Sequence, residues 1–297
     1  MKKYLSFLFT AATAVALIVA CDKNGNGDNN GGLSPDDPAT IKSENLIAYF
    51  PFESEAEAVK TGTGISYSKK AGAAGFVKGI RGNAYANTAA DVANFSYLEF
   101  NLAENNTIKD MSSFTLSCWV KSPAPTDSPA MFSINGGDAN MGSLLIMYEG
   151  WGCNADSLYV KPYLFDAGSR EWKGHDIGLA NANFTTDRWF HLVYSYNEVD
   201  SKISLYANGK FVADNGRWAG PEVDGQQEPL GKLELDAAMS KLYIGAWFNN
   251  LDGTHSDGWR KSYPGSMDEL RIWNTALTLE EIESLYRKEV LIADGIE

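Results

Sequence analysis

The sequence has few of the residues from which most catalytic and metal-binding sites are built. It contains three cysteines and three histidines in 297 residues. No two histidines have the spacing of a metal-binding pair, and no Gly-x-Ser-x-Gly motif is present. Nothing in the sequence therefore indicates a zinc site or a serine hydrolase.

Positive charge is also scarce. Lys and Arg number 25 against 38 Asp and Glu, so the formal net charge is −13 at pH 7. A strongly acidic protein repels the phosphates of nucleic acids and the charges of polyanionic glycans. We therefore expect no nucleic-acid partner, whereas neutral polysaccharides and cations are compatible with the composition.

Long apolar runs are absent except near the N-terminus. Residues 5–20 carry no charge and follow Lys2 and Lys3. The run is shorter than the roughly 20 residues of a membrane-spanning helix, and its layout predicts a signal peptide at residues 1–20. It ends in Ile-Val-Ala-Cys at Cys21, which resembles the lipobox of bacterial lipoproteins. The resemblance implies cleavage before Cys21 and lipidation of this residue; the alternative is an ordinary signal peptide followed by a chance cysteine.

The segment after Cys21 is rich in Gly, Asn, Asp and Pro and has almost no apolar side chains. Such a segment cannot bury enough surface to offset its conformational entropy, so residues 21–40 are expected to form a disordered tether. A Gly-rich chain of this length spans roughly 25 Å. The membrane contact that we expect is the lipid anchor alone.

The charges of this segment bear on the membrane in which the anchor lies. Asp22 and Asp28 loosely fit the acidic stretch that, in some Gram-negative phyla, marks lipoproteins for the outer face of the outer membrane. This is the location that we expect. In enterobacterial-type sorting, however, an Asp directly after the cysteine retains the lipoprotein at the inner membrane, so the sequence leaves the leaflet open.

Residues 41–297 have the pattern of a β-rich domain. Residues 267–274 are expected to form a strand, in which alternate residues face opposite sides. Thr278 and Glu281 then form a capping box for a helix expected at 278–288. Asn208 and Gly209 are the preferred pair for a type I′ hairpin turn.

Seven segments resemble, in order, the strand motifs of laminin-G-like domains in the concanavalin A-like lectin/glucanase superfamily. They are residues 46–53, 79–100, 114–121, 189–196, 203–210, 242–246 and 265–282. The resemblance implies an all-β fold: an antiparallel two-sheet jelly-roll sandwich with one short C-terminal helix. A fold shared by many proteins says little by itself about function.

The family often carries one Ca²⁺ ion that joins the first and last strands. The resemblance implies Glu53 and Asp268 as ligands, among the six to eight oxygens that calcium prefers. Glu53 stands where the family usually has Asp. The alternative for Asp268 is a buried, hydrogen-bonded carboxylate that holds a turn.

The superfamily also includes β-glucanases, which place two carboxylates on one face of a strand. The nearest match here, Glu222 to Glu228, has a longer spacing. Pro221, Gly225 and Pro229 predict a loop in this segment. We therefore expect no enzyme activity.

Several tryptophans lie outside the strand motifs. Trp151, Trp218 and Trp259 stand among Gly, Asn and Asp, in segments typical of loop tips. An exposed Trp is unfavourable unless it stacks on a partner such as the apolar face of a sugar ring. We expect these three to form one carbohydrate-binding face, with Trp247 behind or beside them. The alternative is that the loops fold over and pack their own tryptophans.

The sequence thus favours a non-catalytic surface lipoprotein that binds a carbohydrate, most simply a neutral glycan. One alternative is an adhesive or structural module that binds a cell-surface protein, and another is a glycoside hydrolase. Two cysteines remain besides Cys21. A disulfide between Cys118 and Cys153 is compatible with an extracytoplasmic compartment, whereas the apolar strand around Cys118 equally fits a buried free thiol.

Overall fold

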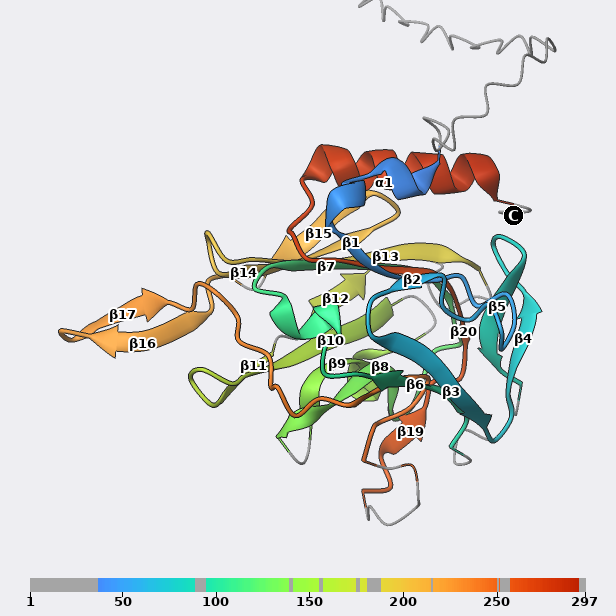
Figure 1. The fold of residues 1–297 in the computed structure, drawn as a ribbon, viewed down its shortest axis with the longest axis horizontal. Helices are drawn as coiled ribbons and strands as arrows, with labels where there is room; N and C mark the ends of the chain where they lie inside the picture. Colours follow the sequence, from blue (N-terminus) through green and yellow to red (C-terminus); the bar gives the residue numbers. More distant parts are fainter. Residues whose placement is uncertain are drawn as a thin grey trace, which may run out of the picture. The chain divides into compact units, whose positions relative to one another are not determined.

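The computed structural model describes residues 37–88, 95–138, 141–154, 157–174, 177–180, 188–214, 216–249, 251 and 257–293. These residues all belong to one compact unit, Ser34–Glu297. Two large sheets pack face to face in this unit, and one helix lies on the outside (Figure 1). The expected all-β sandwich with a C-terminal helix is confirmed.

The first sheet, sheet A, has a central path of seven strands. In spatial order they are β15 (Lys210–Asp214), β14 (Lys202–Ala207), β13 (Phe190–Asn197), β7 (Phe114–Lys121), β20 (Ser266–Trp273), β1 (Leu46–Phe50) and β2 (Thr61–Gly62). The hairpin of β4 (Ala74–Lys78) and β5 (Asn83–Asn87) joins this sheet through β20. The last strand of the chain therefore lies beside the first, at the centre of the sheet.

The second sheet, sheet B, also has a central path of seven strands. In order they are β11 (Glu171–Gly174), β10 (Ser157–Asp166), β9 (Gly142–Tyr148), β8 (Ser128–Asp138), β18 (Lys241–Ile244), β6 (Tyr97–Leu102) and β3 (Ile65–Ala71). Two short strands lie beside this path: β12 (Ile177–Ala180) pairs with β10, and β19 (Arg260–Ser262) runs parallel to β8. Short 3-10 turns occur at Pro38–Thr40, Ser43–Asn45, Thr107–Asp110 and Gly150–Gly152.

The main core fills the space between the sheets because alternate residues of each strand face inward. In β10, Leu158, Val160 and Leu164 are buried in this core, whereas Tyr159 and Lys161 between them are half-buried on the outer face of sheet B. This outer face is not bare. The chain after β18 crosses it, and Trp247 packs there on residues of β8 and β9.

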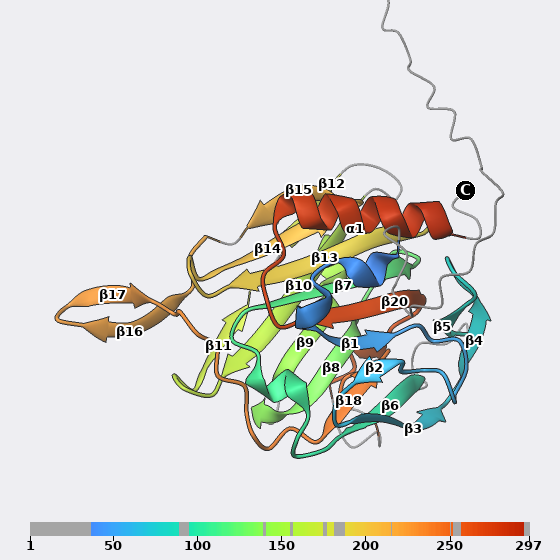
Figure 2. The same ribbon diagram turned by 45° about the horizontal axis from the view of Figure 1, so that its top comes forward.

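Helix α1 (Leu279–Ile292) covers the outer face of sheet A (Figure 2). The Thr278 side chain accepts from the Glu281 N–H, and the Glu281 carboxylate accepts from the Thr278 N–H, so the expected capping box is present. Ile282 and Leu285 are buried against Val193 and Trp273 of the sheet. Within the described residues, no helix is both long and apolar enough to span a membrane.

Two local expectations need correction. Residues 38–40, assigned to the tether, form a 3-10 turn in which Thr40 accepts a hydrogen bond from Lys288 of α1. The segment from Glu222 to Glu228, expected to be a loop, lies in a hairpin of β16 (Ala219–Val223) and β17 (Gln226–Pro229), because Asp224 and Gly225 adopt the left-handed backbone of a tight turn. This hairpin extends away from the sandwich (Figures 1 and 2).

Both described cysteines are free thiols, so the alternative without a disulfide holds in this structure. Cys118 is fully buried in the main core, and burial raises the pKa of its thiol. Burial also raises the pKa of the Cys153 thiol. Neither thiol is activated as a nucleophile by its surroundings. Cys21, the expected lipidation site, lies outside the described residues.

Candidate functional site

Two of the four candidate tryptophans form one aromatic cluster on the outer face of sheet B. Trp247 is 1% exposed, packs on Ala130, Leu145 and Met147, and donates its indole N–H to the Ser128 carbonyl over 2.8 Å. Trp259 is 41% exposed and meets the Trp247 ring edge to face, with 5.4 Å between centroids. The buried ring therefore holds the exposed one in place.

Arg260 completes this cluster. Its guanidinium lies 4.8 Å from the centroid of the Trp247 ring and 5.0 Å from that of Trp259. The same group donates a hydrogen bond to the Asn249 side chain over 2.9 Å and forms an ion pair with Asp257 at 3.1 Å. A cation over two indole rings stabilises both rings, so the Trp259 side chain needs little further ordering to bind a ligand.

Trp151 stands on the same face of sheet B. It is 73% exposed, in the 3-10 turn that follows β9, and its ring lies 5.1 Å from that of Tyr159. The Tyr159 side chain is on the outer face because its neighbours in β10 point into the core. Trp151 thus has one ring face supported by tyrosine and the rest open to solvent.

The start of β8 lies between the two exposed tryptophans. Gly150, beside Trp151, has no room for a side chain because the carbonyls of Thr126 and Asp127 press against it. On the other side, the Ser128 N–H donates to the carbonyl of Trp259 over 2.9 Å. Two strand spacings separate the backbones of Trp151 and Trp259, which is about 10 Å.

A cavity of about 200 Å³ lies next to this point. Its walls come from residues 123–127, Pro129, residues 261–262 and Pro264, and they include four prolines together with the polar side chains of Asp127 and Lys261. We refer to Trp151, Trp247, Trp259, Arg260 and this cavity as the Trp rim. An apolar hollow with a few polar groups and flanking aromatic rings is the usual form of a small-molecule site.

The expectation that Trp218 lies exposed at a loop tip is wrong. Trp218 is 6% exposed, belongs to the main core, and stacks on Tyr196 with 5.1 Å between ring centroids. Its backbone N–H donates to Ser201 and its carbonyl accepts from Leu230, at the two ends of the segment that carries the β16–β17 hairpin. The glycines nearby serve this turn, and the ring anchors the base of the hairpin.

A serine, a histidine and a carboxylate meet on the outer face of sheet A, beneath α1. The His191 Nε2 atom is 2.6 Å from the Ser117 hydroxyl and 3.2 Å from the Glu289 carboxylate. Both partners contact the same ring nitrogen, whereas a catalytic triad uses the two nitrogens for different partners. All three side chains are buried, so this arrangement resembles a structural network more than a reactive centre.

The same network contains the buried ion pairs of Arg271 with Glu289 and Glu269. Burial raises the pKa of Glu289, but the Arg271 charge and the hydrogen bonds from His191 and Trp119 together hold it below its usual range. Tyr49 donates its hydroxyl hydrogen to Glu269 over 2.8 Å, and the Arg271 guanidinium lies 4.2 Å from the Tyr49 ring centroid. These contacts fasten α1 to the sheet.

Asp268, a calcium candidate, is fully buried and already has partners. Its carboxylate accepts from the backbone N–H groups of Ile80, Arg81 and Glu269, at 2.8 to 3.1 Å. Burial and the charge of Glu269 raise its pKa to about 8 in spite of these donors. The arrangement fits a carboxylate that holds the turn at residues 79–82 better than it fits a metal ligand.

Glu53, the other calcium candidate, binds the same turn from its other side. Its carboxylate accepts from the Asn83 N–H at 2.8 Å. In the part of the chain that the structure describes, no three His, Cys, Asp or Glu side chains gather as metal ligands. Calcium binding at Glu53 and Asp268 stays a prediction.

Sequence reasoning missed Arg260 of the Trp rim and Tyr159, whose ring lies beside Trp151. The alternation of β10 was available as a signal for Tyr159, but its pairing with Trp151 needs the strand to lie beside the turn. Arg260 directly follows Trp259, yet its contact with Trp247 forms only because the chain after β18 crosses the outer face of sheet B. Both contacts join segments that are separated in the sequence.

Several toxin binding domains are among the solved structures that are similar to this chain. They include the ligand-binding domain of botulinum neurotoxin serotype D in complex with N-acetylneuraminic acid, at 12% identity, a TM-score of 0.53, and coverage of 84% of this chain and 52% of that chain. The binding domain of Paraclostridial mosquitocidal protein 1 has 15% identity, a TM-score of 0.54, and coverage of 82% and 52%.

A third similar structure is the binding domain of botulinum neurotoxin DC in complex with rat synaptotagmin II. It has 10% identity, a TM-score of 0.52, and coverage of 84% of this chain and 52% of that chain. The present chain thus spans about half the length of the chains that it matches, and at these identities the similarity concerns the fold. No curated protein matches the sequence.

A family model matches residues 93–283, more than half of the chain, and covers most strands of both sheets, including the closing strand β20. This match agrees with the sandwich and with the capped helix after its last strand. The chain belongs to the laminin G-like family of the concanavalin A-like lectin/glucanase superfamily.

Proposed function

We propose that the protein is a non-catalytic surface lipoprotein that binds a neutral glycan at the Trp rim. The observation that carries this proposal is the pair of exposed tryptophans, each supported by a second aromatic ring, on either side of the same strand start. Exposed rings that are held rigidly lose little entropy when a sugar stacks on them. The toxin domains that share the fold include one bound to an acidic sugar, N-acetylneuraminic acid, which supports sugar binding, though not the neutral charge of the ligand, by analogy of fold only.

The polar groups of the cavity give the site hydrogen-bonding capacity beside the stacking surfaces. Asp127 accepts hydrogen bonds and Lys261 donates them, so sugar hydroxyl groups have a partner of each kind. The overall charge of −13 favours an uncharged ligand over an anionic one. A neutral sugar chain that crosses the start of β8 would contact both exposed rings.

The entry of the chain into the domain suits a lipid anchor. Residues 38–40 lie against α1, on the outer face of sheet A, whereas the Trp rim is on the outer face of sheet B. The sandwich separates the two faces. The tryptophans of the rim therefore face away from the point at which the chain enters the domain. A lipid anchor at Cys21 would leave them accessible.

Replacing Trp151 or Trp259 by Ala should weaken glycan binding by roughly 1–3 kcal/mol, the range known for stacking on aromatic side chains. Stability should change little, because each ring has a large exposed area. A glycan array probed with the full-length protein identifies the ligand, and calorimetry on each variant then measures the affinity.

The control for this experiment is Phe211→Ala. Phe211 is an equally exposed aromatic residue, but it lies on β15 of sheet A. Its removal should leave the affinity unchanged. If no neutral glycan binds, or if Phe211→Ala weakens binding as much as the tryptophan variants, the Trp rim is not the site. Release of free sugar from a bound glycan would argue for a glycoside hydrolase instead.

Lipid anchoring is tested separately. We expect Cys21→Ala to abolish the incorporation of radiolabelled fatty acid and to release the protein from the membrane fraction, because the cysteine thiol is the site of acylation. Cys153→Ala, which removes a cysteine inside the domain, should have no such effect. Equal labelling of the wild-type and Cys21→Ala proteins would show that this protein is not a lipoprotein of this type.

A second candidate function is the binding of a cell-surface protein. The β16–β17 hairpin favours it, since this hairpin extends from the sandwich with Val223 half exposed and both strand edges free of further pairing within the described residues. Isolated hairpins are marginally stable in water, so a partner would stabilise this one. A similar toxin domain binds a protein receptor, which is an analogy of fold alone.

A further inference from the structure

A second cavity, of about 280 Å³, lies apart from the Trp rim, beside β1 of sheet A. It is formed by Tyr49 of β1, the loop of residues 51–60 and Arg81 in the turn between β4 and β5. The Tyr49 side chain is on the outer face of sheet A, since its neighbours Ala48 and Phe50 belong to the main core. The cavity therefore shares no residue with the Trp rim.

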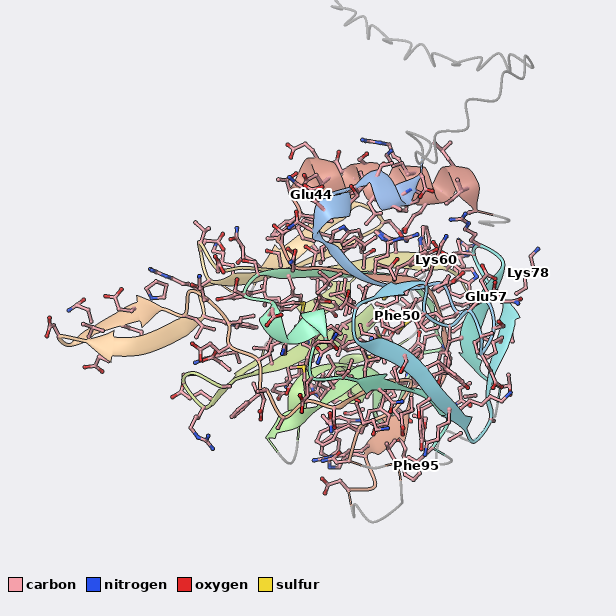
Figure 3. The ribbon with its side chains drawn as sticks, viewed as in Figure 1. Glu44, Phe50, Glu57, Lys60, Lys78 and Phe95 are labelled. Atoms are coloured by element: carbon pink, nitrogen blue, oxygen red, sulfur yellow. The ribbon has the colours of Figure 1, made fainter. Side chains whose placement is uncertain are left out.

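Four charged side chains surround this cavity: Glu53, Glu57, Lys60 and Arg81. Figure 3 labels Glu57 and Lys60, which extend from the loop after β1. Within the described chain these four groups form no ion pair with one another, although ion pairs are frequent elsewhere on the surface. Lys60 instead lies 5.7 Å from the centroid of the Tyr49 ring. The walls thus present two cations and two carboxylates that do not neutralise one another through ion pairs.

The backbone around this cavity is strained. Phe52 has a φ of 54° and Glu269, behind Tyr49, a φ of 52°, although neither is a glycine. This backbone conformation is disfavoured for a bulky residue, and such residues concentrate at functional sites. The Phe52 ring is fully buried beside Phe50 and Tyr85, which holds the strained turn in place.

The strained turn orients Glu53. Its carboxylate accepts from the Asn83 N–H, and its carbonyl accepts from the Asn83 side-chain amide, both at 2.8 Å. The carboxylate also presses against Gly82, where any side chain would collide with it. One carboxylate of the cavity is therefore fixed in direction by the fold and not left to sample the solvent.

We propose that this cavity binds a small zwitterion, an aliphatic α-amino acid. A ligand with one carboxylate and one ammonium group matches both signs of the wall: Lys60 and Arg81 bind the carboxylate, while Glu53 and Glu57 bind the ammonium group. A ligand with a single charge would leave one pair of wall charges without a partner. Because a zwitterion has no net charge, the protein's charge of −13 does not repel it.

The remaining walls select the side chain of the ligand. Pro51, Ala56 and Val59 are apolar and line the same cavity. They offer a surface for an aliphatic group, and burying it adds to the affinity without further charges. Tyr49 also lines the cavity. Its hydroxyl is already bound to Glu269.

The test uses the purified full-length protein, with L-valine and L-leucine as probes in calorimetric titrations. We expect at least one of the two to bind. 4-Methylpentanoic acid, which lacks the ammonium group of leucine, and 3-methylbutylamine, which lacks its carboxylate, should each bind at least tenfold more weakly. The variants Lys60→Gln and Glu57→Gln should each lower the affinity for the amino acid at least tenfold, and both sites are exposed enough for folding to be retained.

Lys78→Gln is the matched control. Lys78 is an exposed lysine of β4 that does not line the cavity (Figure 3). Its replacement should leave the affinity unchanged. The proposal is overturned if neither amino acid binds, if a single-charge analogue binds as well as leucine, or if Lys78→Gln weakens binding as much as Lys60→Gln. Binding of D-glucose that is lost in Lys60→Gln would also overturn it, since this would make the cavity a sugar site.

Discussion

Replacing Arg271 by Ala is expected to lower the free energy of unfolding by about 3–5 kcal/mol, because two buried carboxylates lose their cation. Arg271 is 1% exposed and binds Glu289 of α1 and Glu269 of its own strand. Burial lowers the pKa of this guanidinium, but the charges of Glu289 and Glu269 raise it more strongly, so it stays protonated. Equilibrium unfolding in urea at neutral pH measures the loss.

The matched control is Arg287→Ala. Arg287 lies on the solvent side of α1 and pairs with Glu283 over 3.7 Å, with both side chains well exposed. Exposed pairs of this kind contribute about 0.5 kcal/mol or less. Replacing all three buried charges together, by Arg271→Met, Glu269→Gln and Glu289→Gln, should recover much of the stability, since no charge is then buried alone. A loss of less than about 1 kcal/mol in Arg271→Ala would show that water reaches this network.

The second large effect is expected for Trp218→Ala, which should lower the free energy of unfolding by about 3–5 kcal/mol, as truncation of a core tryptophan does. The ring is buried in the main core and stacked on Tyr196, at the base of the β16–β17 hairpin. Thermal melting compares the stability of this variant with that of Trp151→Ala. Trp151 is 73% exposed, so its removal should change stability by less than about 0.5 kcal/mol.

A milder replacement separates packing from hydrogen bonding at this position. The Trp218 indole N–H is buried and has no hydrogen-bond partner among the residues that the structure describes. Trp218→Phe removes this unsatisfied donor and keeps the stacking, so it should be much less destabilising than Trp218→Ala. If Trp218→Ala instead melts like the wild type and loses glycan binding, the ring belongs to a binding site and the main-core assignment is wrong.

The fold was accessible from the sequence because its signals are local. The capping box at Thr278 and Glu281 and the Asn208–Gly209 turn involve neighbouring residues, and both are present in the structure. The helix extends to Ile292, beyond the expected end, because the buried carboxylate of Glu289 is held by Arg271 and Trp119 across the sheet. A charged residue at that position gave no local sign of being buried.

The strand periodicity, the start of the helix and the family to which the motifs belong follow from the order of residues alone, since short-range periodicity and turn chemistry set them. The exposure of each tryptophan, in contrast, depends on the folded protein. Trp218 and Trp259 stand in similar polar surroundings along the chain, yet one stacks on Tyr196 in the core and the other lies on Trp247 at the surface. The burial of a side chain depends on which distant strand packs against it. The long-range pairing of strands, such as β20 beside β1 and β19 beside β8, sets that arrangement.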